Sequence, residues 1–538
     1  MPKHYFAVPS PSCRQAPFAT IVNAFTLALS LLFVSETLAQ RQNAVPSNRF
    51  GLEPGAYSVG FQLLEEQDHS RAVTGGNAST THARPVRIYL WYPAKGTAKP
   101  MRFGRYAALA DDDIWPPEIA GNLRDVLEYS RGPLARSLGP AGFEALLQRP
   151  VLAAENAKPL AGPFPLIVIG QGLYYESPIT FAALGEYLAG RGFVVATTPL
   201  VGTNSPLVRN DAQDLETQVR DLEFVIAHAR RLPFVSPERL GVLGFDQGGM
   251  AGLILVMRNA DVDAFASLDS GILYPHPSGL PGASPNYDPF ALRIPWLHAT
   301  SPRGATPPSD SDVKSLFETA VHSNRYLLVA DGMGHVDFTS YVLIEGRRAM
   351  PNYWGDWAPE RAVRHGIVAE YINNFFAAFL RHDAESLVFL SRDPNGAFPG
   401  SNMTLEQRAA TPSSIGYDEL VQAIVAGRAE QAINELRAVA GVEPNHIFLD
   451  EAHLQRLAVS LLYTWGFAKE AMPLIEFTAE RYPSSAQAQA MMAEGYVLIE
   501  NYSAAIEVLS KYVQQHPNDA GAQARLEQVR NLESQKSE

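Results

Sequence analysis

Cysteine is nearly absent from this chain, which has a single one, Cys13, among its 538 residues. Cys13 lies in an N-terminal segment that we expect to be removed from the mature protein. A mature chain without cysteine cannot form an intramolecular disulfide, use a cysteine nucleophile or bind a metal ion through thiolates.

Positive charge and metal-ligand spacing are also scarce. The 43 lysines and arginines are outnumbered by 56 acidic residues, which gives a formal net charge of −13. Such a chain, with no run rich in lysine or arginine, lacks the basic face of a nucleic-acid-binding protein and the basic patch of a membrane-surface protein. The 13 histidines show no metal-ligand spacing on a predicted helix face. We therefore predict no nucleic-acid partner, no metal ion and no cofactor.

Long hydrophobic runs are limited to one, which extends from Phe18 to Val34. Lys3 and Arg14 precede this run, and Thr37-Leu38-Ala39 follows it with small residues suited to cleavage. The pattern is typical of a secretory signal peptide, which we predict over residues 1–39. The alternative is a retained membrane anchor, because a run of this length is near the lower limit for a span. The polar residues that follow favour cleavage, so we expect an exported protein, periplasmic or extracellular.

Residues 40–405 have the pattern of an α/β domain. Tyr57–Phe61 and Val86–Trp91 are expected to be paired strands. After Pro163, short apolar runs alternate with segments of helical periodicity. The expected strands are 166–169, 193–196, 240–243, 264–268, 296–299 and 326–329, and the expected helices are 211–231, 249–258 and 360–380. This alternation predicts a doubly wound, mainly parallel sheet.

An insertion is expected between the first strands and this alternating region. Residues 101–161 are rich in helix formers and interrupted by prolines. The segment is more typical of an added lid than of a core layer, and we predict a lid insertion there.

The C-terminal residues 412–535 repeat with a period typical of paired helices. The separation of Ala471 from Ala505 along the chain equals that of Pro483 from Pro517, and it matches the tetratricopeptide period. A small residue allows two helices to approach, and a proline ends the second helix of a unit. Together with Tyr496 and Tyr502, these positions resemble a tetratricopeptide repeat, so we predict an all-α repeat domain that binds a protein or peptide partner. The alternative is a set of helical hairpins without repeat ancestry.

One short stretch carries the chemistry. Gly244-Phe245-Asp246-Gln247-Gly248 follows an apolar strand and precedes a helix rich in glycine. This strand, turn and helix are typical of a nucleophile elbow, in which the central side chain is held on a strained backbone. The flanking glycines relieve crowding at such a turn. The alternative is an ordinary tight turn, but the spacing favours an elbow with Asp246 at its tip.

Asp269 is the expected acid partner. It directly follows the strand after the elbow, where ligands bind at the carboxyl edge of a parallel sheet. The next strand ends in Thr300-Ser301-Pro302 without a carboxylate, which favours Asp269 over Asp310 or Asp312. The alternative role for Asp269 is to cap a helix or turn.

His335 is the expected base, and an oxyanion loop is expected earlier in the chain. His335 lies on a loop with glycines on its N-terminal side, just after a late strand, and its alternative is an ordinary surface histidine. Gly170-Gln171-Gly172-Leu173 follows the strand 166–169. We expect the backbone N–H groups of Leu173 and Gln247 to form the oxyanion hole. Tyr174 and Tyr175 adjoin this loop and either reach the pocket or pack as core aromatics.

The chain resembles a known family at these positions. Residues from about 55 to 390 are similar to the dienelactone-hydrolase-like branch of the α/β-hydrolases, close to bacterial relatives of platelet-activating-factor acetylhydrolase. The segments that carry the resemblance are Arg84-Pro85, Trp91-Tyr92-Pro93-Ala94, Phe164-Pro165-Leu166-Ile167-Val168, the elbow, Leu268-Asp269 and Gly334-His335-Val336-Asp337-Phe338. The family acid follows the strand after the elbow, which matches Asp269. The chain departs from the family at Asp246, where the family has serine or cysteine.

This departure changes the expected reaction. An aspartate side chain is already anionic near neutral pH and needs no base to attack. Attack on an ester would form a mixed anhydride, as reactive as the substrate, whereas attack on a saturated carbon would form an alkyl ester. Haloalkane dehalogenases and epoxide hydrolases, distant branches of the fold, place aspartate at the elbow for this purpose. We therefore predict a hydrolase with an Asp246–His335–Asp269 triad acting on a small organic substrate.

A second hypothesis is a catalytically inactive scaffold that binds partners through its repeats. Enzymes with an elbow aspartate usually carry a helical cap after the strand that here ends at Leu268. Residues 270–292 are short and rich in proline and glycine, and cannot form such a cap. Retention of Asp269, His335 and the elbow glycines favours the enzyme.

Overall fold

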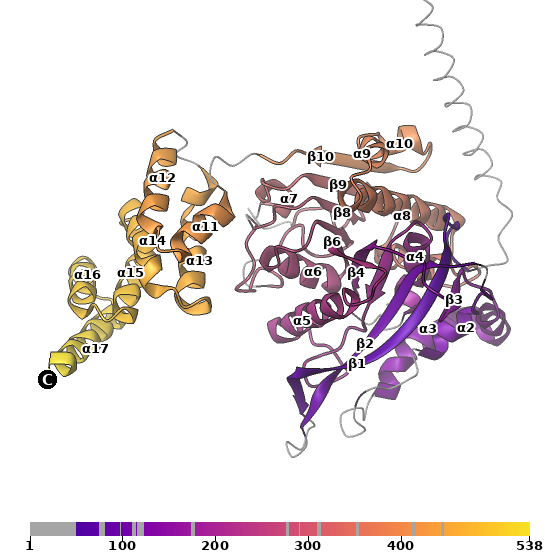
Figure 1. Cartoon of the computed structure of the whole chain (residues 1–538), viewed down its shortest axis with the longest axis horizontal. Helices are drawn as coiled ribbons and strands as arrows, with labels where there is room; N and C mark the ends of the chain where they lie inside the picture. The colour runs from indigo at the N-terminus through magenta and orange to yellow at the C-terminus, as the bar shows by residue number, and fades with distance from the viewer. Residues whose placement is uncertain are drawn as a thin grey trace, which may run out of the picture. The chain divides into compact units, whose positions relative to one another are not determined.

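The computed structural model describes most of the chain after residue 49 (Figure 1). The described residues are 50–74, 81–96, 98–109, 115, 123–173, 178–275, 279–289, 291–308, 314–350, 355–411, 416–442 and 446–537. The predicted signal peptide, Tyr174, Tyr175, Asp310 and Asp312 lie outside these residues. Within them, none of the helices combines the length and the apolar character that a membrane crossing requires.

Ten strands of the described chain form one sheet. In sheet order they are β10 (Met403–Arg408), β9 (Arg325–Ala330), β8 (Trp296–Thr300), β7 (Ala264–Leu268), β6 (Val235–Phe245), β4 (Phe164–Gly170), β5 (Val194–Thr197), β2 (Thr81–Ala94), β1 (Ser58–Thr74) and β3 (Ala153–Glu155). Strands β4 to β9 are parallel, whereas β2 and β10 run antiparallel to their neighbours. The mainly parallel sheet is confirmed, and its strand order fits the α/β-hydrolase fold.

Helices cover both faces of this sheet. The main ones are α4 (Ile179–Ala189), α5 (Ala212–Ala229), α6 (Gln247–Arg258) and α8 (Pro359–Leu380). On β6, a Cβ at Gly241 would lie 2.6 Å from Phe376 of α8, whereas a Cβ at Gly252 of α6 would lie 3.2 Å from Val242. Since adjacent strand residues point to opposite faces, α6 and α8 lie on opposite sides of the sheet (Figure 1). The doubly wound arrangement is therefore confirmed.

A large apolar core lies between the sheet and helices α5 and α6. It is built from strand residues at every second position and from the inward faces of the two helices. Its fully buried members include Ile88, Leu90, Leu166, Val168, Val219, Leu222, Val242, Leu253 and Phe265. This packing fixes the strands whose carboxyl ends carry the candidate site.

The segment predicted as a lid contributes to the sheet and to a buried aromatic cluster. It contains α2 (Phe103–Leu109), α3 (Leu123–Leu147) and β3, and β3 pairs in parallel with β1. Tyr106 of α2 accepts a hydrogen bond from the indole of Trp91 and donates one to Glu186, both at 2.7 Å. Part of the insertion is thus a structural layer, and its role as a lid stays a prediction.

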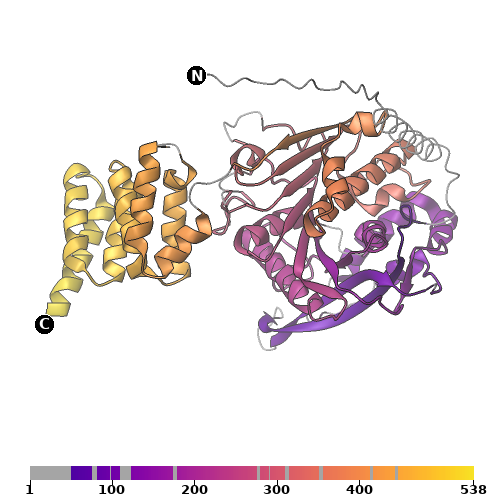
Figure 2. The same cartoon turned by 45° about the horizontal axis from the view of Figure 1, so that its top comes forward.

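The described residues between 417 and 537 are mainly helical, as predicted, and form antiparallel helix pairs followed by the single helix α17. The helices are α11 (Tyr417–Val425), α12 (Ala429–Val442), α13 (Glu451–Val459) continued by the π-turn Ser460–Thr464, α14 (Ala468–Arg481), α15 (Ala486–Leu498), α16 (Tyr502–Gln515) and α17 (Ala520–Ser537). The first helices of the three pairs begin at Tyr417, Glu451 and Ala486, and the last helix begins at Ala520, so the starts are at nearly equal intervals along the chain. Ala471 and Ala505 are fully buried in the second helices. Figure 2 shows these helices side by side in sequence order.

Candidate active site

The turn after β6 is a strained elbow with Asp246 at its tip. Asp246 has φ 51° and ψ −122°, a conformation that costs an L-residue free energy and is found mainly at functional positions. Its backbone is held by a hydrogen bond from Asp246 N–H to the Leu268 carbonyl at 3.3 Å and by one from the Ser270 hydroxyl to the Asp246 carbonyl at 2.6 Å. The strand ends at Phe245 and helix α6 begins at Gln247, so the side chain projects from a sharp bend.

Close backbone packing explains the glycines around this bend. A Cβ at Gly244 would lie 2.4 Å from the Gly248 carbonyl oxygen, and a Cβ at Gly248 would lie 2.2 Å from the Gly170 backbone. A Cβ at Gly172 would lie 2.7 Å from the Asp246 Cβ. No side chain fits at these distances. The elbow and the loop after β4 are therefore pressed together, and that contact brings the loop to Asp246.

The two carboxylate oxygens of Asp246 have different surroundings. Its Oδ2 accepts a hydrogen bond from the backbone N–H of Leu173 at 2.9 Å. Its Oδ1 lies 3.9 Å from Nε2 of His335. About a quarter of the Asp246 side chain and 40% of the His335 side chain are exposed, so both groups can be reached from outside. One oxygen is thus anchored by the loop, while the other faces the imidazole.

His335 is held on its other side by Asp269. Nδ1 of His335 lies 2.8 Å from Oδ2 of Asp269. The imidazole stacks on the buried ring of Phe245, with ring centroids 4.5 Å apart and planes inclined by 26°. A hydrogen bond at Nδ1 and an aromatic surface beneath the ring fix the direction in which Nε2 points. The structure thus brings Asp246, His335 and Asp269 together.

Three donors besides the histidine surround Asp269. Its Oδ1 accepts hydrogen bonds from the Thr300 hydroxyl at 2.7 Å and from both the backbone N–H and the hydroxyl of Ser301 at 2.8 Å. Burial alone would raise the pKa of this carboxyl group. The hydrogen bonds from His335, Ser301 and Thr300 outweigh burial and hold the pKa of Asp269 well below its usual range. The acid therefore stays ionised beside the imidazole.

The pKa of His335 is raised above its ordinary value. Burial lowers it, but the hydrogen bond to Asp269 and the charges of Asp246 and Asp269 favour the imidazolium and outweigh burial. Arg303, in the turn after β8, acts in the opposite direction and lowers the pKa. The imidazole is thus a stronger base than a free histidine.

The backbone before His335 is also anchored. Asp337 accepts a hydrogen bond from the Gly334 N–H at 2.9 Å, and its other carboxylate oxygen lies 3.3 Å from the buried guanidinium of Arg347. His365 of α8 contacts the Asp337 carbonyl through Nδ1 at 3.0 Å. These contacts keep the loop that carries His335 against α8.

Sequence reasoning did not identify Thr300, Ser301 and Phe245 as parts of the site. Thr300 ends strand β8, which lies beside the strand that precedes Asp269, and Ser301 follows it. Their hydroxyl groups were the signal in the sequence, because hydroxyls donate hydrogen bonds to a neighbouring carboxylate. Phe245 immediately precedes the elbow residue. Gln247, predicted as an oxyanion donor through its backbone, begins α6, and its side chain is 1% exposed. Among the described residues, no group of three or more His, Cys, Asp or Glu could hold a metal ion.

Comparisons with known proteins do not assign the chain to a family. No protein-family model matches it, and no curated protein matches it. Among solved structures, a ferulic acid esterase from Streptomyces cinnamoneus aligns over 68% of this chain and 98% of its own, with 24% sequence identity and a TM-score of 0.46.

Proposed function

We propose that this protein is a hydrolase in which Asp246 attacks a saturated carbon and forms a covalent alkyl ester. The observation that supports the proposal is the separate placement of the two Asp246 oxygens, with Oδ2 on the Leu173 N–H and Oδ1 toward His335. A carboxylate held through one oxygen presents the other to a substrate in a fixed direction.

In the first step, Oδ1 of Asp246 forms a bond to the electrophilic carbon of the substrate. The bond between that carbon and the leaving group breaks, and its electron pair goes to the leaving group. No proton leaves the nucleophile, because the side chain reacts as a carboxylate. The leaving group is a halide ion, or the oxygen of an epoxide ring, which stays attached to the alkyl chain as an alkoxide and takes a proton from water.

In the second step, water hydrolyses the ester. Nε2 of His335 takes a proton from water as its oxygen bonds to Cγ of Asp246, and Asp269 stabilises the imidazolium. Oδ2 becomes the oxyanion and is stabilised by the Leu173 N–H, with the Gln247 N–H as the second proposed donor. The tetrahedral intermediate then collapses, the bond from Cγ to Oδ1 breaks, and an alcohol leaves with the proton that His335 returns.

The same geometry argues against ordinary esterase chemistry. A serine elbow leaves the oxyanion hole free for the carbonyl oxygen of the substrate, whereas here the Asp246 carboxylate itself accepts the Leu173 N–H. An acyl group on Asp246 would also be a mixed anhydride, which offers no energetic advantage over the substrate. We therefore assign alkyl halides or epoxides, rather than carboxylic esters, as the substrate class.

A trapped intermediate tests this proposal. We would incubate His335→Gln with primary alkyl halides and epoxides and measure the intact mass, because this variant can be alkylated but cannot activate water. The expected result is a mass increase that corresponds to one substrate-derived group, located on Asp246 by peptide mapping. The double variant Asp246→Ala/His335→Gln is the control. A panel in which no compound modifies His335→Gln would contradict the proposal and favour the inactive scaffold.

The hydrolase domain is proposed to belong to the dienelactone-hydrolase-like branch, and the protein to be exported after cleavage of its signal peptide. The C-terminal helices are proposed to be tetratricopeptide repeats that bind a protein or peptide, on the basis of the regular intervals at which their pairs begin. Partner binding would be the protein's main activity under the scaffold hypothesis. The hydrogen bond between His335 and Asp269, with Asp246 Oδ1 3.9 Å from the imidazole, supports the enzyme over it.

A further inference from the structure

Helix α5 contacts the loop that supplies the oxyanion donor. The Nε2 group of Gln218 donates a hydrogen bond to the backbone carbonyl of Gln171 at 2.8 Å. The Gln171 side chain in turn donates to the Thr198 carbonyl, in the loop after β5, at 3.2 Å. Gln218 is 3% exposed and Gln171 is 1% exposed, so both amides are shielded from bulk water. Two buried glutamine amides therefore connect the loop after β4 to the elements beside it.

The contact lies two residues from the oxyanion donor. Gln171 is followed by Gly172, which is packed against the Asp246 side chain, and then by Leu173, whose N–H binds Oδ2 of Asp246. A Cβ at Gly248 would lie 2.5 Å from the Gln171 carbonyl oxygen. The Gln171 carbonyl therefore lies between the start of α6 and the Gln218 amide. A shift of this peptide would turn the Leu173 N–H relative to the carboxylate.

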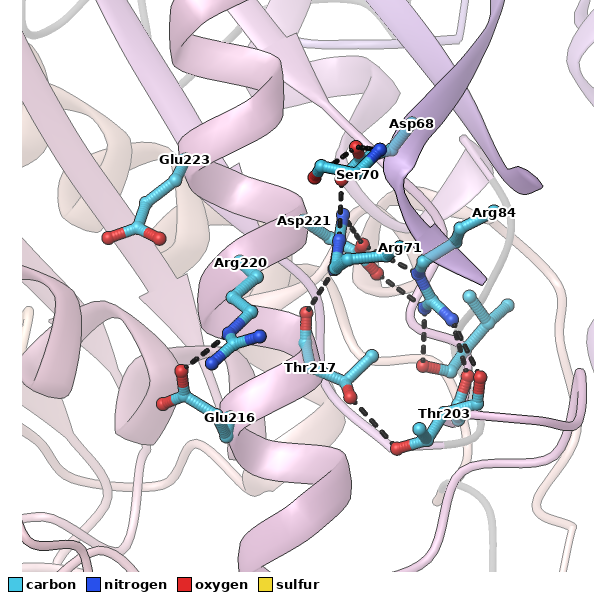
Figure 3. Close-up of polar contacts among 12 residues, drawn as sticks. Asp68, Ser70, Arg71, Arg84, Thr203, Glu216, Thr217, Arg220, Asp221 and Glu223 are labelled. Atoms are coloured by element: carbon cyan, nitrogen blue, oxygen red, sulfur yellow. Dashed lines mark hydrogen bonds and ion pairs between the residues drawn. The ribbon is translucent and has the colours of Figure 1, made fainter. Parts of the chain in front are cut away.

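Helix α5 is itself firmly anchored through residues that neighbour Gln218 in the sequence, among them Thr217 and Asp221 (Figure 3). Asp221, one turn further along the same helix face, accepts two hydrogen bonds from the buried guanidinium of Arg84, at 2.8 and 2.6 Å. Arg71 adds an ion pair with Asp221 at 2.8 Å. The hydroxyl group of Thr217 is hydrogen-bonded to that of Thr203 at 2.8 Å, and Thr203 lies in the loop that also contains Thr198. The helix thus cannot slide without breaking a buried charge pair, which makes it a rigid support.

We propose that Gln218 is a positioning residue for the oxyanion loop, held in place by the Arg84–Asp221 pair of its helix. Gln218 does not touch the reacting atoms. It fixes the peptide of Gln171, and through Gly172 it sets the direction of the Leu173 N–H. The inference rests on the proposed function for its catalytic consequence, because oxyanion stabilisation matters when water attacks the ester of Asp246.

The variants separate a directing hydrogen bond from simple packing. Gln218→Leu removes the donor, whereas Gln218→Glu keeps the shape but places a carboxylate against a carbonyl oxygen. Protonation of that glutamate restores a donor, so the defect of Gln218→Glu is expected to diminish as the pH falls. Gln213→Leu and Gln213→Glu are the matched controls, because Gln213 lies exposed on the same helix.

The first measurement does not need a substrate. The amide proton of Leu173, observed by NMR in full-length protein labelled with ¹⁵N-leucine and assigned with Leu173→Ile, reports the hydrogen bond to Asp246. We expect its resonance to move in Gln218→Leu, to move in a pH-dependent way in Gln218→Glu and to stay in place in both Gln213 variants. An unchanged Leu173 resonance in the two Gln218 variants would overturn the proposal.

The second measurement follows the covalent intermediate. Hydrolysis of the ester is expected to slow by about 10- to 100-fold in Gln218→Leu, less than the effect of removing an oxyanion donor outright, while formation of the ester changes far less. Equal slowing of both steps would also overturn the positioning role. If the Leu173 resonance moves but no compound ever alkylates the protein, the proposed function fails and the positioning role stands.

Discussion

The Oδ2 atom of Asp246 accepts a hydrogen bond from the backbone N–H of Leu173 at 2.9 Å. The Asp246 carboxylate oxygen therefore occupies the place that the carbonyl oxygen of a substrate would take in an oxyanion hole. Under the proposed function, this arrangement suits a nucleophile whose own carbonyl oxygen carries the negative charge during hydrolysis, and it makes the site poorly suited to esters.

Replacing the elbow carboxylate by a hydroxyl should create esterase activity. In Asp246→Ser, the Leu173 N–H becomes free for a substrate carbonyl, and His335 lies close enough to activate the hydroxyl. We expect hydrolysis of an aryl acetate on the order of 100-fold faster than in Asp246→Ala, the control that keeps His335 and the Leu173 N–H but lacks any nucleophile, since base activation of a positioned hydroxyl contributes at least that much. Equal rates in the two variants would show that the site cannot support acyl transfer.

The pH dependence of ester hydrolysis should follow the protonation of His335. The neutral imidazole is the base. In the free protein both Asp269 and Asp246 raise its pKa, whereas in the ester intermediate the charge of Asp246 is gone and Asp269 is the carboxylate that still raises it. Hydrolysis is therefore expected to fall as the pH drops through the raised pKa of His335. Asp269→Asn should lower that pKa and slow hydrolysis by about 10²- to 10⁴-fold. Arg303→Gln should raise the pKa of His335 further, because it removes a nearby positive charge.

NMR titration of the His335 ring measures both shifts, with Arg437→Gln on the C-terminal helices as a control for a lost surface arginine. Shifts of the His335 pKa in the same direction in Asp269→Asn and Arg303→Gln would contradict the electrostatic account of the site.

A methyl group at Gly172 should disturb the site and the fold together. The added Cβ would lie 2.7 Å from both the Asp246 Cβ and the Phe245 ring. We expect Gly172→Ala to lower the free energy of unfolding by about 1–3 kcal/mol and to displace the Leu173 N–H from the carboxylate. Gly441→Ala is the matched control in helix α12, because a Cβ there meets nothing within 4 Å. This variant should raise the free energy of unfolding by about 0.5–1 kcal/mol or leave it unchanged. Denaturant unfolding compares the two variants. If Gly172→Ala were as stable as Gly441→Ala, the loop after β4 could move aside without a cost in free energy.

The Arg84–Asp221 pair should be needed for stability, since both side chains are almost fully buried. Arg84→Met leaves the Asp221 charge in the protein interior with Arg71 as its remaining partner, and we expect a loss of about 3–5 kcal/mol. The double variant Arg84→Met/Asp221→Leu removes both charges and should be less destabilised than Arg84→Met alone. Thermal or urea unfolding tests this order, and a double variant less stable than Arg84→Met would contradict it, because Asp221 would then be stabilising without Arg84.

The sequence revealed the parts of the site that depend on local signals and chain order. Gly244 and Gly248 flank a residue with positive φ, as the elbow pattern predicts, and Asp269 and His335 follow the strands on which the triad order places them. Contacts between distant segments carry no such local signal. Arg84 and Asp221 are 137 residues apart, and Gln218 reaches Gln171 across 47 residues.

The sequence also did not indicate two strands, which are short or polar and depend on pairing with distant segments. Ala153–Glu155 has three residues and is a strand because it pairs with β1, and Met403–Arg408 alternates weakly but is fixed by β9. Strand β10 extends the sheet to Arg408, three residues beyond the domain boundary expected at residue 405. Likewise, the first strand was expected over Tyr57–Phe61 but extends from Ser58 to Thr74, because its polar second half pairs with β2.

The most direct test of the account is a single turnover in water enriched in ¹⁸O, with the protein in excess over an alkyl halide or epoxide that the trapping experiment identifies. Attack by Asp246 places an original carboxylate oxygen in the alcohol and an ¹⁸O atom from water in the Asp246 side chain. The account predicts label in the peptide that contains Asp246 and none in the first equivalent of alcohol. Label in that alcohol and none in Asp246 would mean that water attacks the substrate directly, and would contradict the covalent mechanism.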